Sequence, residues 1–312
     1  MIQFDKLKIV TNIRYITKIN TDLFIENKKG SEILYYKYKQ KTPYNLIIIV
    51  NYFQNELVIE FTSKILKDKF IELINKDTIK ECISNINELN ICQLDIDNII
   101  SDSIVVKCDI TKDIIYDNIN KITDYININR SNYQKWNCKK LKNGITLENV
   151  VTTARNKKRI TIYNKEKEIR KSENKPFLKI LSDKNKVFDY LKNKIRFELN
   201  INTKIQIRKL LLTCNNNLLE VLNSNESPII TILDEAIANK INYSKQSSNL
   251  REHERELLLK ECEYDLSKVE LTIRNYTSKN TSIKRMMQPY IDLNNRLNIE
   301  SDKYINIKEL LK

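Results

Sequence analysis

Two stretches, RITIYNKEKEI at residues 159–169 and KIRFELN at residues 194–200, decide how this chain is expected to fold. Polar and apolar residues alternate in both, which is typical of β-strands with one buried face. The polar side of the first strand, expected at residues 159–165, carries Arg159, Thr161, Tyr163 and Lys165. The polar side of the second carries Lys194, Arg196, Glu198 and Asn200. A tyrosine, a carboxylate and several cations are therefore expected on one sheet face.

The rest of the chain places these strands in an α+β fold. Alternating patterns predict four strands in the first sixty residues and another at 103–111, where Ile104, Val106, Cys108 and Ile110 are expected to point inward. Helical spacing follows from residue 63 to residue 89 and again at 116–125, and one or two strands are expected at 133–151. This order predicts an antiparallel sheet with helices on one face and the other face open. No internal repeat is apparent.

From residue 203 onward the pattern is helical. Thr203 is expected to cap one helix, residues 215–217 precede a second, and Pro228 suits the first turn of a third. Amphipathic stretches at 252–273 and 282–297 follow a polar segment at 243–250. We therefore expect an α+β domain at 1–202 and a helical region at 203–312.

Charge makes a polyanion the first partner to consider. The chain has 54 Lys and Arg against 40 Asp and Glu, a net charge of +14. The densest basic stretch, residues 151–171, surrounds the first strand, so the expected phosphate-binding residues are Arg155, Lys157, Lys158, Arg159, Lys165 and Arg196. The alternative is a solvated surface whose lysines reflect AT-rich coding DNA.

Several classes of site are excluded by composition. Gly30 and Gly144 are the only glycines, which excludes glycine-rich phosphate loops. His253 is the only histidine and lacks the context of a zinc hydrolase or a serine triad. The six cysteines form no CxxC pair and are expected to be reduced thiols. No apolar run suggests a membrane span, so a cytoplasmic protein is expected.

Tyr163 and three acids are the candidate catalytic residues. A tyrosine can attack a phosphodiester and hold the strand as a phosphotyrosine, and the neighbouring cations are expected to lower its pKa. Asp109 and Glu198 would hold Mg²⁺ or Mn²⁺ if their strands are neighbours, with Asp113 as a third ligand. Glu60 lies farther away in sequence. The alternatives are a strand tyrosine and an ordinary polar face.

Four short motifs, in this order, resemble those of the replication initiators of rolling-circle plasmids and related phage replication proteins. They are VKCDITKDI (Asp109, Asp113), GITLENVV (Gly144, Thr146), TIYNKEKEI (Tyr163, Lys165, Glu168) and IRFELN (Arg196, Phe197, Glu198). The resemblance covers residues 104–200. The chain departs from the family in lacking the His-hydrophobic-His metal motif, and Lys107 stands where the first motif has arginine.

The resemblance implies a metal-dependent tyrosine DNA endonuclease and strand transferase that nicks an origin and stays joined to the 5′ phosphate. Tyr163 is the expected nucleophile, while Tyr116, Tyr125 and Tyr133 remain open. Asp109, Asp113 and Glu198 would position the metal, and Arg196 and Arg159 would orient the phosphate. Further expected partners are a host helicase and a second copy of the chain. Two alternatives stay open, a non-catalytic DNA-binding replication accessory protein and a basic structural phage protein.

Overall fold

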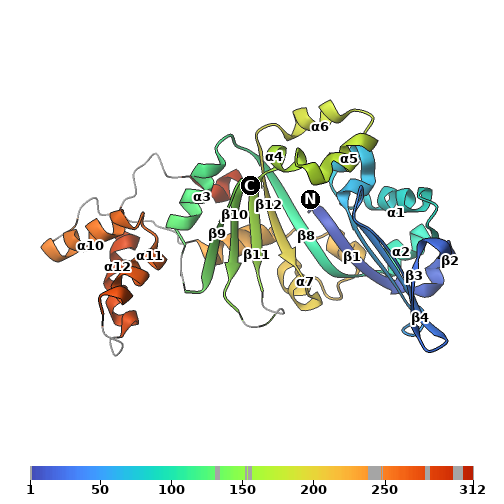
Figure 1. Ribbon diagram of the computed structural model, residues 1–312, viewed down its shortest axis with the longest axis horizontal. Helices are drawn as coiled ribbons and strands as arrows, with labels where there is room; N and C mark the ends of the chain where they lie inside the picture. The colour runs from blue at the N-terminus through green and yellow to red at the C-terminus, as the bar shows by residue number, and fades with distance from the viewer. Residues whose placement is uncertain are drawn as a thin grey trace.

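The computed structural model of the chain describes residues 2–130, 134–151, 153, 157–237, 247, 249–277, 282–297 and 305–311. Its main feature is a ten-stranded antiparallel sheet in the order β3-β4-β5-β6-β1-β8-β12-β11-β10-β9, seen across the middle of Figure 1. These strands are β1 (Phe4–Asn12), β3 (Ile25–Lys29), β4 (Glu32–Gln40), β5 (Leu46–Asn51), β6 (Glu56–Thr62), β8 (Ile104–Ile115), β9 (Trp136–Leu141), β10 (Gly144–Asn149), β11 (Arg159–Asn164) and β12 (Lys194–Ile201). A second, two-stranded sheet pairs β2 (Ile16–Ile19) with β7 (Cys92–Leu94).

The large sheet repeats one topology twice. In the first half β1 is followed by β3, β4 and β5 in a meander, and β6 then pairs with β1. In the second half β8 is followed by β9, β10 and β11, and β12 then pairs with β8. The two halves meet where β1 and β8 pair antiparallel. The two halves therefore share the same order and connection of strands. The sequence did not predict this repeat.

Helices cover the apolar face of the sheet. Buried side chains of α1 (Ile79–Glu88), α2 (Ile96–Asp102) and α3 (Ile119–Ile128) belong to the same core as those of the strands. So do buried side chains of α7 (Lys204–Leu211), α8 (Leu218–Leu222), α9 (Pro228–Ala236) and α13 (Ile307–Leu310). The expected α+β class, with a sheet, covering helices and a helical C-terminal region, is confirmed.

A smaller apolar cluster lies at one end of the sheet. It contains Phe70, Ile169, Phe177, Leu181, Val187 and Leu191. Phe70 belongs to the kinked 3-10 segment η3 (Ser63–Glu72). The others belong to α4 (Lys165–Ile169), α5 (Lys175–Ile180) and α6 (Lys184–Leu191), except for Leu181, which directly follows α5. Figure 1 shows these three helices above the ends of β12, β8 and β1. The polar face is thus capped at this end.

Three further helices have a core of their own. Buried residues of α10 (Leu250–Glu261), α11 (Leu266–Asn275) and α12 (Ile283–Arg296) pack together, at the left of Figure 1. Arg130 joins this helical cluster to the main body, because its Nη2 donates to Asp265 at 3.2 Å and to Ser267 at 2.7 Å. The domain boundary after residue 202 stays a prediction, while α7, α8, α9 and α13 pack with the sheet.

Local signals in the sequence explain most elements. Thr203 caps α7 by accepting from the backbone N–H of Gln206, Asn217 caps α8, and Pro228 begins α9, as expected. The stretch expected to be helical at 252–273 is broken between α10 and α11. The strand β3 was missed because its five residues are all exposed and show no apolar alternation.

The inward residues at the start of β8 differ from the prediction. The pairing of β1 with β8 shifts between Lys8 and Ile9, so that a β-bulge changes the alternation. As a result Val105 is fully buried, whereas Ile104 is 38% exposed. Cys108 and Ile110 point inward as expected.

Within the described residues, no helix combines the length and the apolar character needed to cross a membrane.

Gly144 offers a test of the tight packing between β10 and β11. An added Cβ at this position would lie 2.0 Å from the carbonyl oxygen of Ile162 and 2.8 Å from Cα of Tyr163. Gly144→Ala must therefore push the strands apart, and we expect it to lower the free energy of unfolding by about 1–3 kcal/mol, measured by urea denaturation. Lys139→Ala, on the neighbouring strand and exposed, is the control and should change stability by less than about 0.5 kcal/mol.

Candidate active site on the polar face of the sheet

The registers of β11, β12 and β8 assemble the predicted residues in two rows. In one row Tyr163 pairs with Arg196, which pairs with Asp113. In the other, Arg159 pairs with Asn200, which pairs with Asp109. Glu198 lies between the rows on β12, because side chains two residues apart on a strand share a face. Asp109 and Glu198 are thus on neighbouring strands.

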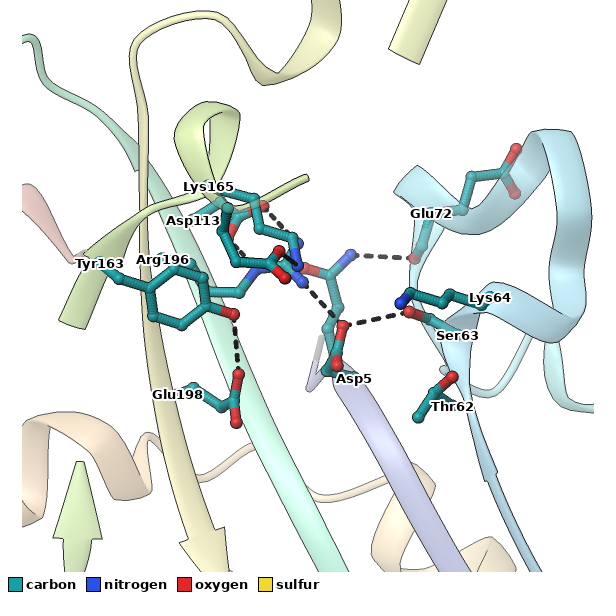
Figure 2. A network of polar contacts seen from close by, with 12 residues as sticks. Asp5, Thr62, Ser63, Lys64, Glu72, Asp113, Tyr163, Lys165, Arg196 and Glu198 are labelled. Atoms are coloured by element: carbon teal, nitrogen blue, oxygen red, sulfur yellow. Dashed lines mark hydrogen bonds and ion pairs between the residues drawn. The ribbon is translucent and has the colours of Figure 1, made fainter. Parts of the chain in front are cut away.

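Arg196 forms the buried centre of the site. Its side chain is completely buried, and its Nε and Nη2 donate to the two oxygens of Asp113 at 2.7 and 2.8 Å. Its Nη1 donates to Asp5 at 2.8 Å, as Figure 2 shows. Burial alone would lower the pKa of Arg196, but Asp113 and Asp5 outweigh it and raise that pKa well above its usual value. The guanidinium is therefore held as a cation between two carboxylates, and its role with a DNA phosphate stays a prediction.

Asp5 is the site residue that the sequence reading missed. It lies where the pairing of β1 with β8 shifts between Phe4 and Lys6, and its carboxylate also accepts from the hydroxyl of Ser63 at 3.1 Å. Burial opposes its ionisation, but the charges of Lys165 and Arg196 lower its pKa. The signal was present in the sequence, since the buried residues Phe4 and Leu7 are three positions apart rather than two.

Tyr163 and Glu198 are joined by a hydrogen bond. The phenol of Tyr163 donates to Oε2 of Glu198 at 2.9 Å, and both side chains keep partial access to solvent. Burial, together with the charges of Asp5 and Asp109, raises the pKa of Glu198 to about 7. A carboxylate with such a pKa is suited to accept a proton near neutral pH.

The pKa of Tyr163 contradicts the sequence expectation. Neighbouring cations were expected to lower it, but burial and the charge of Glu198 raise it well above the usual value. The charge of Arg196 does act in the expected direction, yet it is shared with two carboxylates. Tyr163 is therefore a neutral phenol at rest, and a nucleophilic role requires a partner that takes its proton.

Lys165 supplies a second buried cation beside the tyrosine. The strand β11 ends at Asn164, and Lys165 begins α4 instead of continuing the strand as expected. Its Nζ lies 2.7 Å from Glu168 and 5.6 Å from the ring centre of Tyr163. Lys165 and Glu168, two of the residues singled out in the TIYNKEKEI motif, thus form an ion pair beside the tyrosine.

The predicted metal ligands are already engaged in contacts with other side chains. Nδ2 of Asn200 lies 2.9 Å from Oδ1 of Asp109 and 3.4 Å from Oε1 of Glu198, so an amide sits between the two acids. Both oxygens of Asp113 accept from Arg196. In the part of the chain that the structure describes, no three His, Cys, Asp or Glu side chains are arranged to hold a metal ion. As arranged, Asp109, Asp113 and Glu198 do not fit a metal ion. Metal binding by this chain stays a prediction.

Three of the predicted phosphate-binding residues lie together where β11 begins, whereas Lys165 begins α4 and Arg196 is buried in β12. Lys157 forms an ion pair with Glu148 at 2.9 Å, Lys158 forms one with Glu235, and Arg159 is exposed. Arg155 lies outside the described residues. The rival tyrosines are placed elsewhere, Tyr116 directly after β8 and Tyr125 in α3, and Tyr133 is outside the described residues.

The buried ion pairs of Arg196 make a prediction about stability. Arg196→Met removes the cation but leaves the carboxylates of Asp113 and Asp5 in place, and we expect the free energy of unfolding to fall by about 3–5 kcal/mol in urea denaturation. The control is Arg170→Met, since Arg170 is exposed and its ion pair with Glu166 is 3.4 Å long. That variant should lose less than about 1 kcal/mol. Equal losses in the two variants would contradict the central role of Arg196.

One family model matches part of the chain. Residues 69–220 match the Phage CRI family model, which is described as the N-terminal part of a replication-associated protein. The matched segment contains β8, β11 and β12, and with them all four motifs that the sequence reading singled out. A search of curated proteins found no match. The match covers residues 69–220, a little under half of the chain, and this segment is therefore similar to phage replication-associated proteins.

Proposed function

We propose that this chain is a phage replication initiator that cuts and rejoins one DNA strand, with Tyr163 as the nucleophile and Glu198 as its proton acceptor. The observation that carries the proposal is the 2.9 Å hydrogen bond from the phenol of Tyr163 to Glu198. Both residues lie inside the segment that matches the initiator family. A tyrosine that already donates to a carboxylate is positioned for general-base activation.

The proposed reaction begins with the phenol oxygen attacking a phosphorus atom of the DNA backbone. As the O–P bond forms, the phenol proton passes to Glu198. The bond from phosphorus to the 3′ oxygen breaks, and that oxygen takes up a proton from solvent and leaves as a hydroxyl. The strand remains joined to Tyr163 through its 5′ phosphate. Attack by a 3′ hydroxyl on the phosphotyrosine reverses these changes and restores the phenol.

The other residues of the site act on charge and position. Lys165, beside the ring of Tyr163, can stabilise the negative charge that develops on the phenol oxygen and the phosphate. Arg196 is a positioning residue, since its contacts go to Asp113 and Asp5. Arg159 begins β11 directly after Lys157 and Lys158, and these cations would contact the phosphate backbone.

Mg²⁺ or Mn²⁺ remains a proposed cofactor that the sequence suggests, and no step above passes through it. Nicking with each ion, and after chelation with EDTA, tests the need for a metal. A helicase and a second copy of the chain likewise remain proposed partners.

The first experiment tests the nucleophile. Wild-type protein should become covalently joined to a single-stranded oligonucleotide that carries the origin sequence, and peptide mapping should locate the phosphate on Tyr163. Tyr163→Phe should lose capture by at least about a thousandfold and retain DNA binding. Tyr116→Phe, Tyr125→Phe and Tyr133→Phe are the matched controls and should react like wild type. Capture that persists in Tyr163→Phe would reject the assignment, and binding without capture in wild type would favour the non-catalytic alternative.

The second experiment tests Glu198 through pH. Its carboxylate accepts a proton only when ionised, so single-turnover cleavage should rise with pH through about 7. Glu198→Gln keeps the shape but cannot take the proton, so the rate should fall by about a hundredfold and this pH dependence should disappear. Glu166→Gln, which alters a carboxylate in α4, should keep the wild-type profile. An unchanged profile in Glu198→Gln would exclude Glu198 as the base.

A further inference from the structure

The polar face continues from the candidate site into the first half of the sheet, where its character changes. Pairing carries the row of Asp109 onto Lys6 of β1 and then onto Thr62 of β6. The next row runs from Lys107 through Lys8 and Glu60 to Ile47. Each half of the sheet has five strands in the same topology. The polar face of the first half is therefore similar in extent to the polar face that carries the candidate site.

Aliphatic residues occupy the middle of this surface. Val10 pairs with Val58, and Val58 pairs with Ile49, so that the three lie side by side on β1, β6 and β5. We define the aliphatic face as Val10, Ile47, Ile49 and Val58. All four residues are partly exposed, whereas the residues of the opposite side, such as Ile9, Ile48 and Leu57, are completely buried.

Lysines surround the aliphatic face. Pairing places Lys37 beside Ile49 and Lys39 beside Ile47, both on β4. On the other side are Lys8 and Lys107, which face each other on β1 and β8. Glu60 lies among them and forms ion pairs with Lys6 and, at 3.6 Å, with Lys8. The rim is therefore positively charged, and an anionic partner with an apolar middle would match it.

We infer that the aliphatic face and its lysines bind the minor groove of duplex DNA beside the cutting site, which extends the proposed function. A minor groove presents sugars and base edges between two rows of phosphates, and aliphatic side chains on sheets contact such surfaces. Single-stranded bases are instead bound by stacking on aromatic side chains. None of the four residues of the aliphatic face is aromatic.

The dimensions of the sheet agree with this partner. Strands lie about 4.8 Å apart, so β4 and β1 are separated by roughly 14 Å, three strand spacings. The minor groove is about 6 Å wide, with phosphates on both sides. Lysines on β4 and β1 would thus reach the two phosphate rows, with Ile49 and Val58 between them. Because β1 pairs with β8, DNA held here would continue toward Tyr163 on the second half of the sheet.

The test measures duplex binding separately from cleavage. Fluorescence anisotropy would use a labelled duplex and protein carrying Tyr163→Phe, which cannot cut. Adding Val58→Glu or Ile49→Glu places a carboxylate on the aliphatic face and should weaken duplex binding at least about tenfold. Leu257→Glu is the control, since Leu257 is 52% exposed on α10, and should leave the affinity within about twofold. Netropsin, a minor-groove ligand, should displace the protein from A·T-rich duplex.

A second pair of variants guards against misfolding. Lys37→Gln with Lys39→Gln changes only surface charges and should reduce the slope of log affinity against log salt by about 2, close to one for each lost phosphate contact. Lys121→Gln with Lys184→Gln, both exposed elsewhere, should leave the slope unchanged. Unchanged affinity in Val58→Glu, an unaltered slope in the Lys37 and Lys39 variant, or insensitivity to netropsin would overturn the inference.

The two proposals fail in different ways. In protein that keeps Tyr163, Val58→Glu should still capture a single-stranded oligonucleotide at a rate within about twofold of wild type. Loss of capture in wild type with duplex binding intact would reject the nucleophile but support the aliphatic face. A change of oligomeric state in Val58→Glu, measured by analytical ultracentrifugation, would assign the face to a second copy of the chain and overturn the inference.

Discussion

The site depends on one buried cation. Arg196 is completely enclosed, and such a charge is tolerated only because Asp113 binds it through two hydrogen bonds and Asp5 through a third. These three residues come from β12, β8 and β1, so the network fixes the central strands with respect to one another. It also determines the electrostatics of the site, because Asp5 contributes to the raised pKa of Glu198 and of Tyr163.

The same arrangement explains why a neutral tyrosine and a carboxylate with a raised pKa are neighbours. Arg196 is nearly neutralised by its two partners, so it provides little stabilisation for a third negative charge. Burial and the remaining acids then favour the protonated forms of both Glu198 and Tyr163. Because the pKa of Glu198 is about 7, its ionised form is populated near neutral pH, and transfer of the phenol proton to it leaves the net charge of the pair unchanged.

Much of this could be predicted from the sequence. Alternation alone placed Tyr163, Glu198 and Asp109 on polar strand faces, and the pairing of β8, β12 and β11 confirmed that these strands are neighbours. Alternation gives the side of a strand but not the depth of burial, so Arg196 was expected at a phosphate although it lies beneath the surface. Asp5 was missed because a bulge interrupts the pattern, and the repeated topology was missed because β3 has no apolar alternation.

The position of β1 has a consequence for how the chain folds. Its two neighbours in the sheet, β6 and β8, begin about 50 and about 100 residues later in the chain, and β12 joins them only near residue 200. Contacts this distant in sequence form slowly because long loops must first close. Until β8 has been synthesised, β1 is an edge strand whose backbone N–H and C=O groups on one side lack partners, and such edges invite pairing with other chains. The first half of the sheet is thus exposed to aggregation during synthesis, and its protection arrives with the same strand that brings Asp109 and Asp113 to the site.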